Sequence, residues 1–269
     1  MSDESAKGDS SALAVGQLPC NDDDGVRTIT FNRPEAKNAM SMAMRERFCA
    51  LLSEAEQSPD IRAVIVTAVD PVFTAGVDFK EASTGNFARK WNAFDAQFAV
   101  NPGKALRSMT TPVICAVNGA CVSGGLEVAL SSAFIVASER ARFADTHARL
   151  GVIATWGLTA LLPRAVGIRK AREMSITGNF VSADEALQIG LVNHVVAHDE
   201  LVPFARKLAT DIPALGSIQE IMRLYMRGDG LSLADALALE TEHTVRRTFD
   251  AKAFGELGTA TAKRGSQKG

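Results

Sequence analysis

PVICAVNGACVSGGLEV occupies residues 112–128, and the rest of the chain can be organised around it. The apolar run at 113–117 predicts a short buried strand, and the Asn-Gly pair at 118–119 predicts a tight loop. A helix is predicted to open at Gly124, with Glu127 in its first turn. A strand, a loop and a helix in so short a stretch indicate an α/β fold.

The opening of this helix can carry chemistry. Adjacent glycines let a ligand approach the bare backbone, and the first N–H groups of a helix have no internal partner. Together with the helix dipole, these groups suit a negatively charged oxygen. Glu127 would lie beside the Gly124 amide, which suggests an oxyanion-binding amide next to a general acid or base. The residues alone equally allow an ordinary helix cap with a surface glutamate.

A strand–helix–strand unit precedes this stretch. The alternating segment VRTITFN at 26–32 predicts a half-buried strand, which Pro34 ends. Ser41 precedes a helical pattern that stops at 58–60, and AVIVTA at 63–68 predicts a buried strand. The buried face of this helix is predicted to contain Met44, Phe48, Leu51, Leu52 and Ala55. The two strands should lie in one sheet, joined by a right-handed crossover.

The remaining segments complete the predicted architecture. A second buried strand should end just before Gly76, with Asp78 capping the next element. Residues 82–102 are either a loosely packed helical lid beside a pocket or an ordinary surface helix. A further strand is expected at 133–138, and the chain should be helical from Ile168 onward. The predicted divisions are a mobile tail at 1–22, an α/β core at 23–195, a C-terminal helical region at 196–254 and a frayed tail at 255–269.

Composition narrows the class of protein. The chain has 269 residues, of which 46% are hydrophobic, and this is enough for a sizeable core. A net charge of −2 gives no basic excess to favour a nucleic-acid or membrane partner. The four cysteines form no CxxC pair, and the spacing of His194 and His198 is more typical of a turn than of a metal site. The polar start lacks a signal-peptide core, and no run is long enough to span a bilayer. We therefore expect a cytoplasmic protein without a metal.

Four segments together resemble one family, the crotonase or enoyl-CoA hydratase/isomerase superfamily. They are FNRPEAKNAM at 31–40, FTAGVDFKE at 73–81, PVICAVNGACVSGGLE at 112–127 and TGNFVSADEALQIGLVNHVV at 177–196. The resemblance implies an α/β fold, a crotonase-like spiral of ββα units with a C-terminal α-helical region. It also implies an acyl-CoA substrate and a homo-oligomer, either a trimer or a hexamer. No separate cofactor is implied, because coenzyme A is part of the substrate.

The resemblance also assigns residues. It implies that the backbone amides of Ala75 and Gly124 hold the thioester oxygen, and it matches Glu127 to the first catalytic glutamate of the hydratases. The implied contacts to the CoA substrate are Ala75, Gly76, Val77, Asp78, Gly124 and, more weakly, Ala36, Lys37 and Lys80. For each lysine a solvated surface role is the alternative to a contact with the CoA phosphates.

One position departs from the family pattern. The second catalytic glutamate of the hydratases falls on His147, in FADTHARLG at 143–151. His147 can replace the glutamate as an acid or base, can form a structural hydrogen bond beside Asp145 or Arg149, or can mark a loss of hydration activity. The family's Pro-Gly-rich turn is also altered, because residues 154–156 read Ala-Thr-Trp.

The resemblance therefore implies an enoyl-CoA hydratase, which adds water across the double bond of a 2-enoyl-CoA through an enolate. Two alternatives stay open because of His147. One is another crotonase-type enzyme, such as an isomerase, a decarboxylase or a thioester hydrolase. The other is a non-catalytic acyl-CoA-binding protein.

Overall fold

The computed structural model describes residues 15–83, 100–214, 216–246 and 255. The chain divides into two compact units at Met222/Arg223, and each unit is described by itself. The first unit contains every strand and the helices up to α11 (Leu201–Asp211). Helix α12 (Gly216–Gly228) crosses the division, and the second unit contains α13 (Leu233–Val245).

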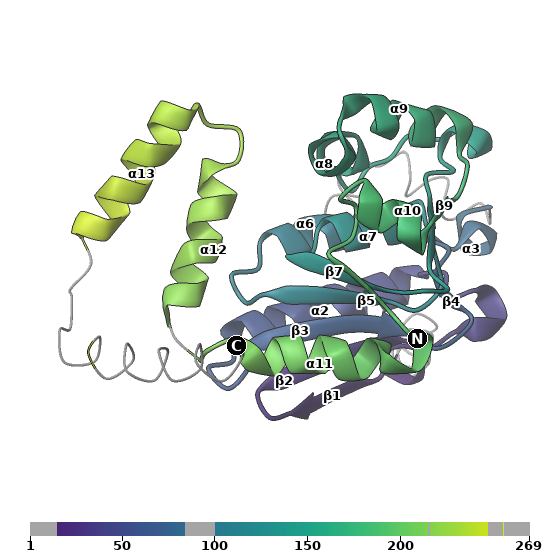
Figure 1. Ribbon diagram of the computed structural model, residues 1–269. Helices are drawn as coiled ribbons and strands as arrows, with labels where there is room; N and C mark the ends of the chain where they lie inside the picture. Colours follow the sequence, from purple (N-terminus) through teal and green to yellow (C-terminus); the bar gives the residue numbers. More distant parts are fainter. Residues whose placement is uncertain (1–14, 84–99, 215, 247–254, 256–269) are drawn as a thin grey trace, which may run out of the picture. The chain divides into compact units, whose positions relative to one another are not determined.

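The first unit is built on a six-stranded sheet (Figure 1). Its strands, in spatial order, are β1 (Cys20–Asp23), β2 (Val26–Phe31), β3 (Ala63–Ala68), β5 (Val113–Val117), β7 (Phe134–Ser138) and β10 (His194–Val196). The β1–β2 pair is antiparallel, and the other neighbouring strands pair in parallel. The predicted parallel crossover between β2 and β3 is therefore confirmed.

A second sheet has four shorter strands. Its order is β4 (Val72–Thr74), β6 (Ala120–Val122), β8 (Arg142–Ala144) and β9 (Val181–Ser182). Each of β3, β5 and β7 is followed along the chain by a short strand of this sheet, namely β4, β6 and β8. Helices α3 (Phe79–Ser83) and α7 (Gly124–Leu130) come after β4 and β6. This repetition is the predicted spiral of ββα units.

Helices cover both faces of the main sheet (Figure 1). Successive residues of a strand point to opposite faces. Val64 and Val66 of β3 accordingly pack in the cluster that contains α2 (Met42–Gln57), while Ile65 packs with Leu201 and Ala205 of α11. Among the described residues, the first unit also contains α6 (Pro102–Arg107), α8 (Leu158–Val166), α9 (Ile168–Thr177) and α10 (Ala183–Gln188), with short 3-10 turns η1 (Pro34–Ala36), η2 (Ala148–Leu150) and η3 (His198–Glu200). The central strands β3 and β5 therefore read as almost continuous apolar runs, because both of their faces are buried.

Helix α2 forms where the sequence predicts it. The Ser41 hydroxyl accepts a hydrogen bond from the Met44 N–H at 3.3 Å and caps the helix. The predicted face is buried, and its members are Met44, Phe48, Leu51, Leu52 and Ala55. The match follows from a strong cap signal and a clean 3.6-residue apolar period.

Three sequence expectations differ from the structure. Strand β1 begins at Cys20 and Leu18 is fully buried, so these residues belong to the core unit and not to a tail that ends at residue 22. The region from Ile168 onward is not wholly helical, because β9 and β10 are strands that complete the two sheets. The expected core boundary at 195/196 falls inside β10. Most of the segment at 82–102 lies outside the described residues.

Glu56 joins the end of α2 to the start of β5. Its carboxylate accepts hydrogen bonds from the N–H groups of Thr110 at 3.0 Å and Thr111 at 2.8 Å, and from the Thr110 hydroxyl. Burial acts to raise the pKa of Glu56, but these hydrogen bonds outweigh it, and the pKa lies below its usual value. The ionised carboxylate therefore stabilises the fold above the usual pKa of 4.5, and this stabilisation is lost as the pH falls through the lowered pKa.

We expect Glu56→Gln to lower the free energy of unfolding at pH 7, because the amide offers only one acceptor oxygen to three donors. The difference from the wild type should narrow as the pH falls from 7 toward 3. Urea unfolding at several pH values measures the loss of unfolding free energy at pH 7 and its change with pH. A difference that stays constant with pH would contradict the role given to the ionised carboxylate.

Asn38 clamps the loop before α2 to the loop before β4. Its side chain is fully buried, donates to the carbonyls of Val69 at 2.9 Å and Val72 at 2.6 Å, and accepts from the Arg33 N–H at 2.7 Å. Asn38→Asp keeps the shape but turns a carboxylate toward two carbonyl oxygens. We expect it to lower the free energy of unfolding by about 3 kcal/mol or more.

Chemical denaturation of this variant is best compared with Asn32→Asp. The Asn32 amide makes one exposed hydrogen bond, to the Gly16 carbonyl at 3.2 Å. That substitution should change stability by less than about 0.5 kcal/mol, since surface changes away from such clamps are usually small. Equal effects of the two substitutions would show that the buried hydrogen bonds of Asn38 contribute no more to stability than the exposed one of Asn32.

Candidate functional site

The N-terminus of α7 provides one free backbone amide. Ser123, just before it, has φ of 48° and ψ of −107°, a conformation that residues with a side chain rarely adopt. Its N–H donates to the Ala144 carbonyl at 2.9 Å, and its hydroxyl oxygen accepts from the Thr146 N–H at 3.1 Å. Within the described part of the chain, the Gly124 N–H has no hydrogen-bond acceptor. The turn thus holds a helix N-terminus with an open donor.

The loop after β4 brings a second amide to the same place. Met40 donates its N–H to the Gly76 carbonyl at 2.7 Å and accepts from the Asp78 N–H at 3.1 Å, as in a parallel ladder. Alternate residues of such a ladder direct their N–H and C=O groups to opposite sides, so the Val77 N–H points away from Met40. A Cβ built on Gly124 would lie 3.5 Å from the Val77 nitrogen. The amides of Val77 and Gly124 therefore lie side by side.

The structure corrects the prediction for Ala75. The Ala75 N–H donates to the Lys37 carbonyl at 3.1 Å, so it is used within the fold and is not available to a ligand. Among the described residues, no acceptor satisfies the Val77 N–H. The prediction that Ala75 supplies the second oxyanion donor is therefore wrong, and Val77, two residues later, is the amide that faces the α7 N-terminus.

Glycine is required where these two amides meet. Gly76 has φ of +90°, and a Cβ on it would come within 2.9 Å of the Gly124 nitrogen and 3.2 Å of the Val122 carbonyl oxygen. A Cβ on Gly124 would lie 3.0 Å from the Trp156 ring and 3.1 Å from the Gly76 Cα. The backbones of Gly76 and Gly124 thus approach each other so closely that a side chain at either position would disturb the Val77 and Gly124 amides.

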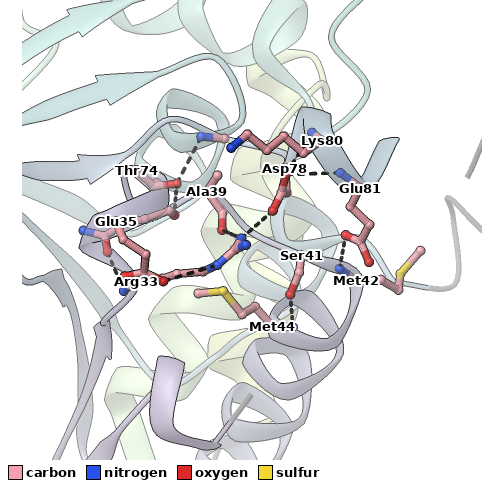
Figure 2. Close-up of polar contacts among 12 residues, drawn as sticks. Arg33, Glu35, Ala39, Ser41, Met42, Met44, Thr74, Asp78, Lys80 and Glu81 are labelled. Carbon is pink, nitrogen blue, oxygen red and sulfur yellow. Dashed lines mark hydrogen bonds and ion pairs between the residues drawn. The ribbon is translucent and has the colours of Figure 1, made fainter. Parts of the chain in front are cut away.

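Ion pairs and caps fix the loop that carries Val77 (Figure 2). The Arg33 guanidinium pairs with one Asp78 oxygen and donates to the Ala39 carbonyl at 3.2 Å. The other Asp78 oxygen accepts the Lys80 N–H at 2.9 Å and so caps α3, as predicted. Glu81 in turn accepts the Met42 N–H of α2 at 2.8 Å. These contacts connect the segment that carries Val77 to the loop at 33–39 and, through Glu81, to the start of α2.

The CoA-contact candidates fall into two kinds. Asp78 is buried and uses its carboxylate for Arg33 and for the cap; burial acts to raise its pKa, but these partners lower it overall. Lys37, at the end of η1, and Lys80, in α3, are exposed, and Ala36 is half-buried. The two lysines are therefore accessible to a phosphate, whereas Asp78 is a structural residue.

Glu127 is the buried carboxylate of the site. It is 2% exposed, and its Oε1 accepts the Trp156 N–H and, at 3.3 Å, the Leu158 N–H. Burial raises the pKa of Glu127 above its usual value, and the Trp156 N–H and the charge of His147 only partly offset this effect. Arg107 donates to the Trp156 carbonyl, which holds the other side of the same residue. Oε1 is thus held by two backbone N–H groups, which leaves Oε2 as the oxygen that can meet another group.

His147 lies opposite the remaining oxygen of Glu127. Its Nε2 is 3.8 Å from Glu127 Oε2, and its Nδ1 is 2.6 Å from Asp145 Oδ1. Of the two hydrogen-bond neighbours that the sequence offers His147, the structure pairs it with Asp145, whereas Arg149 binds the Thr177 carbonyl and the Asn179 side chain. Glu127 and His147 therefore bring a carboxylate oxygen and a ring nitrogen close to each other.

Comparisons with known proteins identify the family. A family model described as Enoyl-CoA hydratase/isomerase matches residues 21–258. The chain belongs to this family. It is 34% identical to a probable peroxisomal enoyl-CoA hydratase of Arabidopsis thaliana over 248 residues, which cover 91% of this chain and 92% of the relative.

Solved structures of the enoyl-CoA hydratase/isomerase family have the same fold. An enoyl-CoA hydratase from Mycobacterium tuberculosis is 46% identical with a TM-score of 0.72, and the match covers 83% of this chain and 95% of that one. An enoyl-CoA hydratase from Bacillus anthracis is 27% identical with a TM-score of 0.84, covering 92% and 96%. The predicted crotonase-like fold is thereby confirmed.

Two further observations complete the description of this family member. No helix in the described segments is long and apolar enough to cross a membrane. Within the same segments, no group of three or more His, Cys, Asp or Glu side chains is arranged to hold a metal ion.

Proposed function

We propose that the protein is an enoyl-CoA hydratase that adds water across the C2–C3 double bond of a 2-enoyl-CoA. The observation that carries the proposal is the pairing of Glu127 Oε2 with His147 Nε2 at 3.8 Å, next to two open backbone amides. A water about 2.8 Å from both atoms forms an ordinary hydrogen bond with each. The names of the relatives from Arabidopsis thaliana and Mycobacterium tuberculosis support the same activity.

The reaction follows from this arrangement. The water oxygen bonds to C3, and the electrons of the double bond move to the thioester oxygen, which the Val77 and Gly124 amides hold as an enolate. One member of the Glu127–His147 pair takes the proton that water loses. The other member gives a proton to C2 as the enolate collapses. One water is added in all, and the pair ends with as many protons as it began.

This scheme makes His147 the functional substitute for the second glutamate of the family. A carboxylate–imidazole pair that shares one proton can supply a base and an acid at once. The pair needs apolar surroundings to bring its two protonation states close in energy, and the buried position of Glu127 supports this.

The proposal extends to binding and assembly. Val77 and Gly124 hold the thioester end of coenzyme A, and Lys37 and Lys80 bind its phosphates; the open amides and the exposure of both lysines support this assignment. No cofactor besides the coenzyme A of the substrate takes part. We further propose a cytoplasmic homo-oligomer, a trimer or a hexamer, on the strength of the family resemblance.

The test is loss of the enoyl-thioester absorbance over a panel of short, long and branched 2-enoyl-CoAs, with the product mass measured. A product heavier by one water supports the proposal. An unchanged mass with a shifted double bond, loss of carbon dioxide or release of free CoA would instead identify an isomerase, a decarboxylase or a thioester hydrolase. Binding without turnover on any member would indicate an acyl-CoA-binding protein.

A further inference from the structure

A second buried carboxylate stands behind His147. Asp145 is 3% exposed, and its Oδ1 lies 2.6 Å from His147 Nδ1 and accepts the His147 N–H at 3.2 Å. The Ser175 side chain also hydrogen-bonds to it. Asp145 directly follows β8, which is paired with β6 and with β9. The carboxylate is therefore held by the sheet and offers its oxygen to one particular ring nitrogen.

Replacing a glutamate by a histidine creates a problem that this carboxylate solves. The two oxygens of a carboxylate are equivalent, but the two nitrogens of a neutral imidazole are a donor and an acceptor. Which nitrogen carries the proton is set by the partner of the other one. A carboxylate at Nδ1 draws the proton there and leaves Nε2 as the acceptor. Nε2 is the atom that faces Glu127.

We propose that Asp145 is a positioning residue that fixes His147 in the Nδ1–H tautomer, so that Nε2 exchanges protons with the water shared with Glu127. This inference rests on the hydratase function proposed above. Asp145 touches no reacting atom; it acts only through the orientation and the tautomer of the His147 ring.

The charges around the pair fit these roles. Burial acts to raise the pKa of Asp145, but its hydrogen bonds to His147 and Ser175 outweigh burial and lower it. The pKa of Glu127 is raised instead, chiefly by burial. Arg107 contacts the Trp156 carbonyl, and the negative charge of Glu127 acts to raise the pKa of Arg107 against the larger effect of burial. Two buried carboxylates are thus driven in opposite directions, which is the pattern expected when one stays ionised and the other handles protons.

The first test is kinetic. We expect Asp145→Asn to lower kcat for hydration by about 10- to 100-fold with KM changed less than about threefold, a loss of the size typical of carboxylates that orient a metal-binding histidine. Asp70→Asn is the matched control, because Asp70 Oδ2 pairs with His198 Nε2 at 3.0 Å in another part of the same unit. Its kcat should remain that of the wild type. Equal losses in both variants, or no loss in Asp145→Asn, would overturn the proposal.

A double-mutant cycle separates positioning from general stability. If Asp145 acts only through His147, Asp145→Asn should cause less than a twofold further loss of kcat in a His147→Gln background. A loss as large as in the wild-type background would overturn the proposal. The pH profile of Asp145→Asn should also shift relative to the wild type, which a loss of stability alone would not cause.

Nitrogen NMR of the 15N-histidine-labelled wild type keeps the proposal testable even if Asp145→Asn fails to fold. The His147 signals are identified by their absence in His147→Gln. A neutral ring protonated at Nδ1 supports the proposal, and a ring protonated at Nε2 overturns it. Absence of hydration by the wild type would overturn the proposed function instead, and the tautomer measurement does not depend on that outcome.

Discussion

Glu127→Gln is expected to lower kcat for hydration by about 10³-fold, within the range of about 10² to 10⁴ typical of a lost general acid or base. The amide keeps the size of the side chain, and its oxygen can still accept the Trp156 and Leu158 N–H groups. Its nitrogen, however, cannot take a proton from water. The loss should appear in kcat more than in KM, because the change affects proton transfer and not CoA binding.

Glu56→Gln is the matched control, because Glu56 is another carboxylate that accepts backbone N–H groups, but at the far end of α2. That variant should be less stable yet hydrate at the wild-type rate. Hydration is measured by enoyl-thioester absorbance at saturating substrate. A Glu127→Gln enzyme with the full rate would remove Glu127 from the mechanism altogether.

The same substitution has a stability signature of opposite sign to that of Glu56. Because burial raises the pKa of Glu127, its favourable contribution is complete at low pH and is lost as the pH rises above the usual 4.5 toward the raised pKa. The free energy of unfolding of the wild type should therefore fall relative to Glu127→Gln as the pH rises over this range. This trend is the stability cost of keeping a buried carboxylate ready for chemistry.

Local signals in the sequence predict the parts of the fold that depend on short-range physics. The cap at Ser41, the apolar period of α2 and the strand at 63–68 are each visible in a few residues, and all are confirmed. Strands β9 and β10 are not visible in this way. They contain two and three residues, and partners far away in the sequence, on β8 and β7, decide their pairing.

The residues of the site can also be separated into those that short-range signals predict and those that depend on long-range pairing. Gly124 and Glu127 lie in one helical turn, so their proximity follows from the sequence alone. The second amide depends on Met40 pairing with Val77, a bridge between distant residues that decides which N–H groups are used and which are open. Alternation along a ladder would have pointed to Val77 once that bridge was known. Asp145 stands two residues before His147, but only the fold shows that it contacts Nδ1 and leaves Nε2 toward Glu127.

Gly76→Ala is expected to lower kcat/KM for hydration by about 10³-fold, comparable to the loss of an oxyanion-hole donor. The new Cβ would lie 2.9 Å from the Gly124 nitrogen and 3.2 Å from the Val122 carbonyl oxygen, and neither backbone atom can move aside cheaply. It would also force an alanine to φ of +90°. The Val77 and Gly124 amides must then separate or tilt, so they can no longer both donate a hydrogen bond to the enolate oxygen.

Gly190→Ala separates this loss from backbone strain. Gly190 has φ of +77° in the turn after α10, but an added Cβ there meets only the Ala165 carbonyl oxygen, at an ordinary 3.5 Å. Both variants should lose roughly 1 kcal/mol or more of stability from the positive φ. Only Gly76→Ala should also lose hydration at a temperature where both are folded by circular dichroism. If the two variants hydrate equally well, the close approach of Gly76 to Gly124 is not what binds the enolate, and the oxyanion site assigned to Val77 and Gly124 is wrong.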